Sequence, residues 1–187
     1  CCGMTPRVGV VLALTGGDLE ATRAGLLHQP DPPPVVEVAT PRPADWNEGL
    51  RRLETEWACL VTPGEVSHCG RFEALLQGAA LMTNAALVHT HLLAPGDAEN
   101  AGETLPCGVG NGEVYHFLKQ PEWYIPAGCA MVRRTAVLDL GGLDERLGHG
   151  AWWDLLLRLA VRFSVGCVAE GWVSCGGWRD PWTDLNL

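Results

Sequence analysis

Unbroken apolar runs alternate with amphipathic segments along the first half of the chain. The runs at 7–14, 35–39, 57–61 and 85–93 are typical of strands covered on both faces. Between them, apolar residues at helical spacing predict helices at about 18–28, 46–56 and 71–80. Strands and helices that alternate with short connections predict an α/β fold, in which a mostly parallel sheet lies between helices.

The last third of the chain has a different order of elements. A short apolar run at 129–132 predicts a strand that leads into a helix beginning at about Arg133. Gly141 and Gly142 then mark a tight turn, and an amphipathic helix begins at about Trp152. Between the two parts, residues 94–124 are rich in Gly, Asn and acidic residues and show little periodicity, so we expect a long functional loop there.

These patterns indicate one domain. With 187 residues, 47% of them hydrophobic, the chain can bury one sizeable core but not two. We expect a single domain over 4–187, made of a first half (4–93), the loop (94–124) and a second half with a C-terminal tail (125–187). Met4 resembles a natural start, so residues 1–3 are interpreted as a cloning remnant.

Charge and cysteine content narrow the class of function. Asp and Glu outnumber Lys and Arg by 22 to 13, whereas a general nucleic-acid binder needs clustered cations. No apolar run approaches the roughly 20 residues that span a bilayer, and no signal peptide opens the chain. The cysteines that follow Met4 are dispersed without a C-x-x-C pair. This favours reduced thiols and a cytoplasmic location.

Three local patterns invite a chemical interpretation. Ser67-His68-Cys69 suggests a nucleophile but lacks a third group, and His89-x-His91 places two imidazoles on one strand face without a third metal ligand. The glycine-rich segment at 108–112 lacks the Lys-Ser/Thr pair of a phosphate loop. All three are interpreted as structural.

The order of motifs from Ile125 to Leu159 resembles the second half of family 2 glycosyltransferases, which have the GT-A fold. In that family a small-residue and glycine strand ends in two basic residues and is followed by a Gly-Gly-[FL]-Asp-Glu turn. An acidic pair then opens a helix that carries Asp-Leu-x-x-Arg-Leu. The matching positions here are Gly128, Met131, Arg133, Arg134, Gly141, Gly142, Leu143, Asp144, Glu145, Asp154, Leu155, Arg158 and Leu159.

The first half resembles the same family through residues 26–29 and 47–50, so the resemblance spans roughly residues 7–175. It implies a three-layer α/β/α sandwich of the nucleotide-diphospho-sugar transferase type, which is Rossmann-like. It also implies a nucleotide sugar as donor substrate and transfer of the sugar to an acceptor. Because ligands gather at the carboxyl ends of parallel strands, the donor is expected across Leu14, Thr15, Gly16, Thr40 and Asn47.

This chain departs from the family at the positions that carry chemistry. An Asp-x-Asp-like motif is expected after the third strand, but residues 62–65 read Thr-Pro-Gly-Glu. Glu65 would then hold Mg²⁺ or Mn²⁺, or arginines would offset the diphosphate without metal. The acidic pair before the last helix is replaced by Ala151-Trp152, and the Asp expected after the second strand by Ala39-Thr40. The histidine expected after the final strand is replaced by a segment ending in Cys175.

The base that deprotonates the acceptor could come from Asp144, Glu145, His149 or Asp154, and the selected candidates are His149 on a glycine-flanked loop and Asp154 at the helix start. Two functions of different class follow. One is a divergent but active glycosyltransferase. The other is a catalytically inactive GT-A module that binds a glycan or a protein partner through its cleft or its Trp-rich C-terminal half, where Trp faces suit sugar rings.

Overall fold

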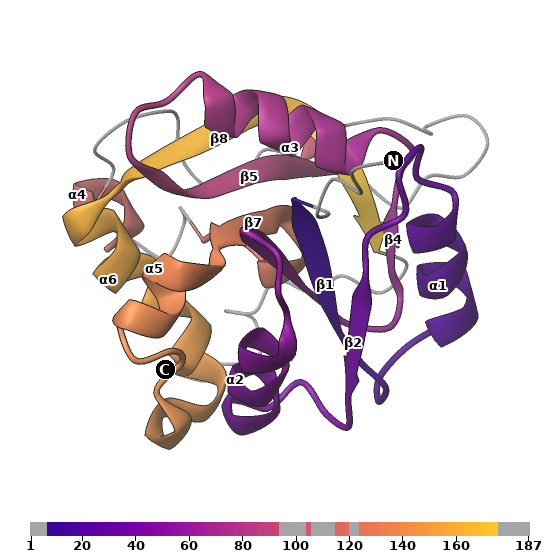
Figure 1. Ribbon diagram of the computed structural model, residues 1–187, viewed down its shortest axis with the longest axis horizontal. Coiled ribbons are helices and arrows are strands. Elements are labelled where there is room, and N and C mark those ends of the chain that lie inside the picture. Colours follow the sequence, from indigo (N-terminus) through magenta and orange to yellow (C-terminus); the bar gives the residue numbers. More distant parts are fainter. Residues whose placement is uncertain (1–6, 94–103, 106–114, 120–123, 176–187) are drawn as a thin grey trace.

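The computed structural model describes residues 7–93, 104–105, 115–119 and 124–175 (Figure 1). The first half contains, in order, β1 (Val8–Ala13), α1 (Leu19–Leu27), β2 (Val35–Val38), α2 (Pro43–Arg52), β3 (Trp57–Val61), β4 (Glu65–Ser67), α3 (Arg71–Ala80) and β5 (Ala85–Leu93). The remainder contains β6 (Thr104–Leu105), α4 (Tyr115–Leu118), the 3-10 turn η2 (Ala127–Cys129), β7 (Ala130–Arg133), α5 (Arg134–Asp139), the 3-10 segment η3 (Glu145–Gly150), α6 (Ala151–Arg162) and β8 (Ser164–Cys175).

The predicted strands and helices are confirmed, with two corrections: the second helix has different bounds, and the expected loop contains two short elements. The second helix begins at Pro43 rather than at residue 46, because proline is favoured in the first turn of a helix. It ends at Arg52, since the buried Leu53 is already extended, with φ −66° and ψ 144°. Within the described part of the expected 94–124 loop, β6 pairs with β5 and α4 forms one helical turn.

The sheet has the strand order β2-β1-β3-β7-β5-β8-β4, and β6 pairs with β5 beside this path. β1 is parallel to β2 and to β3, and β5 is parallel to β8. β7 runs antiparallel to both of its neighbours, and β4 and β6 also run against theirs. The predicted mostly parallel sheet is therefore confirmed for β1, β2, β3, β5 and β8, which share one direction.

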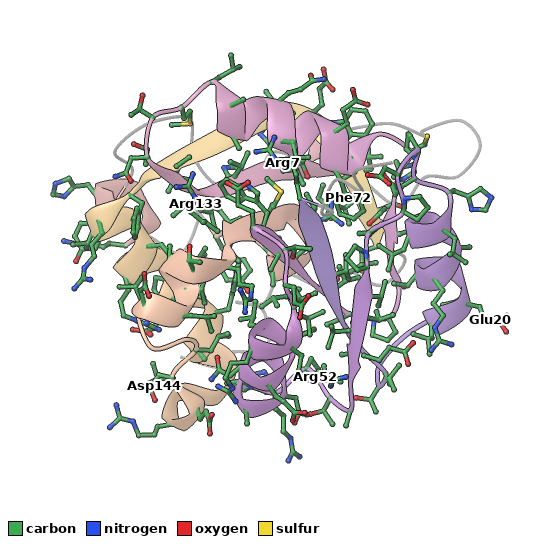
Figure 2. All side chains as sticks on the ribbon, viewed as in Figure 1. Arg7, Glu20, Arg52, Phe72, Arg133 and Asp144 are labelled. Atoms are coloured by element: carbon green, nitrogen blue, oxygen red, sulfur yellow. The ribbon has the colours of Figure 1, made fainter. Side chains whose placement is uncertain are left out.

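Helices cover the sheet on both sides, as Figure 1 shows. On one side Leu26 of α1 and Leu75 of α3 are buried against β1 and β3. On the other side α2, α5 and α6 pack together, with Leu50 and Leu155 fully buried. In Figure 2 Phe72 lies in the interior beneath α3, whereas Glu20 points away from the molecule. The expected three-layer α/β/α sandwich is confirmed.

The parallel strands end at one common edge. In the register of the sheet Ala13 lies beside Val38 and Leu12 beside Val61, so β1, β2 and β3 finish level with one another. The antiparallel β7 begins at this same edge, and Gly128 precedes it. The turns that follow β1, β2 and β3 therefore meet the turn that precedes β7.

No helix within the described ranges is long and apolar enough to cross a membrane.

Candidate functional site

The turns after β1 and β3 are joined by backbone hydrogen bonds. The N–H of Gly17 donates to the carbonyl of Pro63 at 3.2 Å, and the N–H of Gly64 donates to the carbonyl of Asp18 at 3.0 Å. A Cβ on Gly17 would lie 2.8 Å from the Pro63 carbonyl oxygen, so glycine permits this close approach. The adjacent residues 14–16, predicted to contact the donor, are exposed at the rim of this edge.

Glu65 lies at the centre of the same edge, where β4 begins directly after that turn. Its carboxylate accepts a hydrogen bond from the N–H of Thr62 at 2.7 Å. It also packs against Gly128, since a Cβ at that glycine would lie 2.1 Å from Oε1. Burial raises the pKa of Glu65, and the Thr62 hydrogen bond and the Arg71 guanidinium oppose this shift. Burial raises the pKa of Tyr124 to about 12, and the nearby Glu65 contributes in the same direction.

The raised pKa of Glu65 predicts a pH dependence of stability. Between the ordinary carboxyl pKa and the raised one, the folded protein keeps a proton that the unfolded chain has released. The free energy of unfolding should therefore fall as the pH rises through this window. Urea unfolding at a series of pH values should show a steeper fall for the wild type than for Glu65→Gln, and identical slopes would contradict the prediction.

The residues at this edge do not fit a divalent cation. Mg²⁺ demands near-octahedral oxygen coordination, whereas Glu65 is the one carboxylate contributed by residues 62–65 and its Oε2 is already hydrogen-bonded. Cys175, where the resemblance implies a histidine, lies opposite Glu65 in the β4–β8 register, but a thiol is a poor ligand for a hard cation. No cluster of three or more His, Cys, Asp or Glu side chains suited to a metal occurs among the described residues.

A carboxylate that the sequence reasoning missed lies at the end of β2. Both the N–H and the hydroxyl of Thr40 donate to Oδ2 of Asp45, the N–H at 3.0 Å. Asp45 belongs to the first turn of α2, where a carboxylate is favoured by the helix dipole. A carboxylate from five residues further along the chain therefore lies beside Thr40.

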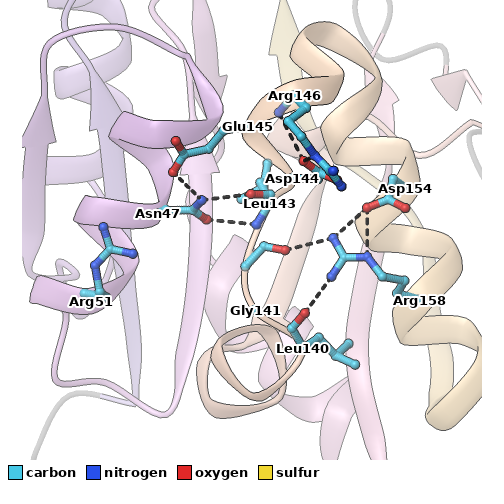
Figure 3. A pocket seen from close by; sticks show the side chains of 11 residues that line it. Asn47, Arg51, Leu140, Gly141, Leu143, Asp144, Glu145, Arg146, Asp154 and Arg158 are labelled. Carbon is cyan, nitrogen blue, oxygen red and sulfur yellow. Dashed lines mark hydrogen bonds and ion pairs between the residues drawn. The ribbon is translucent and has the colours of Figure 1, made fainter.

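Asn47 joins the two halves of the molecule. Its Oδ1 accepts from the N–H of Leu143 at 2.8 Å and its Nδ2 donates to the carbonyl of Leu143 at 2.9 Å, while Glu145 lies 3.4 Å from Nδ2 (Figure 3). Asn47 is 4% exposed. Both polar groups of the amide predicted to contact the donor are thus used within the protein, to hold the Gly-Gly-Leu-Asp-Glu turn against α2.

Replacing Asn47 with alanine should lower the free energy of unfolding by about 1–2 kcal/mol, because the buried N–H and C=O of Leu143 lose their partner. Asn47→Asp is the comparison, since it keeps the acceptor for the Leu143 N–H but places a buried charge against the Leu143 carbonyl and Glu145. Chemical denaturation at neutral pH should therefore rank Asn47→Asp below Asn47→Ala. Equal stability of all three would show that this contact is dispensable.

The two predicted bases line different cavities. His149 is exposed on η3 and lines a cavity of about 480 Å³, together with Arg42, Glu145 and Trp152. Asp154 lines a second cavity of about 500 Å³, shown in Figure 3, and its carboxylate pairs with Arg158 at 2.6 Å. Arg158 also donates to the carbonyls of Leu140 and Gly142, so its pairing with Asp154 fixes the turn that follows α5.

Ala151 and Trp152, where the resemblance implies an acidic pair, lie in the core. Ala151 is 1% exposed and Trp152 is 7% exposed, both at the start of α6. The indole N–H of Trp152 donates to the carbonyl of Ile125 at 2.7 Å. The place of the acid is therefore filled by an apolar side chain that connects α6 to the segment leading to Gly128.

Two histidines of the other candidate patterns contact residues of β8. His68 Nε2 lies 3.1 Å from Ser174 Oγ, and the neighbouring Cys69 is exposed. His89 is fully buried, whereas His91 Nε2 lies 3.5 Å from Cys167 Sγ on the adjacent strand. The glycine-rich segment 108–112 and the C-terminal Trp178 and Trp182 lie outside the described residues.

No family model and no curated protein sequence matches the chain. Solved structures match it by fold. S. aureus TarS 1–349 in complex with UDP aligns with TM-score 0.66 and 8% identity, over 90% of this chain and 60% of TarS 1–349. The mannosyltransferase PcManGT from Pyrobaculum calidifontis, in complex with GDP-Man and Mn²⁺, aligns with TM-score 0.66 and 11% identity, over 96% of this chain and 59% of that one.

The chain thus spans about three fifths of the length of these two structures. At such low identity the likeness concerns the fold alone. It agrees with the layers, strand order and common strand edge described above. The structure has the GT-A fold of glycosyltransferases.

Proposed function

We propose that this protein is a divergent glycosyltransferase that binds a nucleotide sugar at the common carboxyl edge of β1, β2 and β3. The observation that carries the proposal is the meeting of the turns after β1 and β3 with Gly128 around Glu65. Ligands of open α/β sheets bind outside the carboxyl ends of the strands. The structures of similar fold were solved with UDP, or with GDP-Man and Mn²⁺, which supports a nucleotide-sugar donor.

In the proposed reaction the acceptor hydroxyl loses its proton to a base while its oxygen attacks the anomeric carbon of the donor. The bond to the nucleoside diphosphate breaks and the diphosphate leaves with the bonding electrons. His149 is the proposed base, because it lines a cavity beside Trp152, near the position that the family gives to an acid. Asp154 supports the site through Arg158, and the donor contacts are assigned to Leu14, Thr15, Gly16 and Thr40. The proposed location is the cytoplasm.

Nucleotide binding tests the proposal. Thermal unfolding with UDP, GDP and CDP should show a higher melting temperature with at least one of them, because a ligand that binds only the folded state stabilises it by about 2.7 kcal/mol at 100 Kd. Thr15→Trp should abolish the rise by filling the exposed turn after β1, whereas Glu20→Trp, on the exposed face of α1, should retain it. Absence of any rise in the wild type would refute the proposal.

A second candidate function is a non-catalytic GT-A module that binds a glycan or a protein through its cleft or its Trp-rich C-terminal half. The burial of Trp152 in place of an acid favours it. The two functions differ in turnover. Release of nucleoside diphosphate from a nucleotide sugar by the wild type but not by His149→Gln supports the enzyme. Binding of the nucleotide sugar without release by either of these two proteins supports the module.

A further inference from the structure

A buried positive charge lies beneath the candidate site. Arg71 opens α3 and is 0% exposed, although arginine is rarely buried without a partner. Its guanidinium donates to Ser67 Oγ at 2.7 Å and to the carbonyl of Gly128. These contacts connect Arg71 to β4 and to the turn before β7, the two segments that meet around Glu65.

The charge of Arg71 is only partly compensated. No carboxylate lies within ion-pair distance of its guanidinium among the described residues, and its Nε has no hydrogen-bond partner there. Its positive charge nevertheless acts on Glu65 and Cys59. Burial raises the pKa of both groups, and the charge of Arg71 partly offsets this rise. A buried ion is costly unless another charge offsets it. A positive field is therefore available at the edge where Glu65 and Gly128 meet.

We propose that Arg71 takes the place of the divalent cation, so that this protein binds a nucleoside diphosphate without a metal ion. The inference rests on the proposed function. It deepens that function by assigning the positive charge that the diphosphate requires to a side chain that is part of the fold. The misfit of Glu65 and Cys175 to a hard cation is then the consequence of a charge already present beneath the site.

Arg71 acts through its field, because it is too deeply buried to touch a ligand. Electrostatic interactions across a protein interior are screened far less than in water. The bond from Arg71 to the Gly128 carbonyl also fixes the segment that packs against Glu65. Arg71 is therefore a positioning residue and a source of potential for the diphosphate, with no direct part in proton transfer.

The role of Glu65 separates the two ways of binding a diphosphate. If Glu65 holds a metal, Glu65→Gln weakens nucleotide binding. If Arg71 supplies the charge, the Glu65 carboxylate competes with the diphosphate for the same field, and Glu65→Gln strengthens binding. We expect an affinity gain of about 3- to 10-fold, as for the removal of one partly screened charge near the ligand.

The experiment is calorimetric titration of UDP and GDP into the full chain, with EDTA and separately with Mn²⁺. The expected result is equal affinity in both buffers for the wild type and tighter binding by Glu65→Gln. Glu73→Gln is the matched control, because Glu73 is exposed on α3 two residues from Arg71 and should leave the affinity unchanged. Arg71→Lys keeps the positive charge and Arg71→Met removes it, so a field from Arg71 predicts retained binding in the first and weakened binding in the second, whereas a purely structural role through its hydrogen bonds predicts equal loss in both.

Titration with Mn²⁺ alone gives a readout that does not need a nucleotide. Binding of Mn²⁺ to the wild type that is lost in Glu65→Gln would overturn the inference. Nucleotide binding that requires Mn²⁺ and weakens in Glu65→Gln would also overturn it, while leaving the proposed function intact. Absence of UDP and GDP binding in every buffer would refute the proposed function, and the inference with it.

Discussion

Trp152→Asp is expected to lower the free energy of unfolding by about 5 kcal/mol, although it places a carboxylate where the resemblance to family 2 glycosyltransferases implies one. Trp152 is 7% exposed, packs in the core on the α6 side of the sheet and donates its indole N–H to Ile125. Truncating a buried Trp costs about 3–5 kcal/mol, and an unpaired buried carboxylate adds to that cost. Urea denaturation measures the loss.

Val161→Asp is the matched control for this substitution. Val161 lies in the last turn of the same helix and is 62% exposed, so introducing aspartate there should lower stability by no more than about 1 kcal/mol. A small effect at both positions would mean that Trp152 is not an integral part of the core. It would also mean that the site tolerates a restored acid.

Gly128→Val is expected to lower the free energy of unfolding by about 3 kcal/mol and to abolish nucleotide binding. A Cβ at this position would lie 2.1 Å from Glu65 Oε1 and 2.3 Å from Cδ, so the Glu65 side chain would be displaced from the Thr62 N–H. Overpacking of this kind costs about 1–3 kcal/mol, and the displaced carboxylate loses its hydrogen bond in addition.

A double mutant isolates the cause. In Gly128→Val/Glu65→Ala the truncated side chain at position 65 no longer clashes with the added valine. The loss of unfolding free energy in the double mutant should therefore be smaller than the sum of the two single losses by at least about 1 kcal/mol. Additive losses, measured by chemical denaturation of the four proteins, would place the clash of Gly128→Val elsewhere.

The periodic elements were predictable from sequence because their signal is local. The bounds of β3, α3 and β5 agree with the apolar runs and helical spacing that define them. β4 was not predicted, because a strand of three residues after a Pro-Gly turn has no periodicity of its own. It exists because residues 65–67 pair with Cys175, Ser174 and Val173 of β8.

The candidate site was less predictable, because its contacts join residues far apart in the chain. The meeting of Glu65 and Gly128 follows from the direction of β7, which apolar spacing cannot reveal. The contact of Asn47 with the donor stays a prediction. Its position in the motif does not reveal that its amide is bound to Leu143. Arg71 gave no signal, because a helix that begins with arginine normally exposes it.

The interleaved strand order has a consequence for synthesis on the ribosome. β7 and β8 come last among the described strands, yet β7 lies between β3 and β5, and β8 lies between β5 and β4. A nascent chain that has emerged only as far as β5 therefore presents bare edges on β3 and β5, which invite pairing with other chains. Ribosome-bound chains arrested before residue 130 should recruit holdase chaperones, and those arrested well beyond residue 175 should release them.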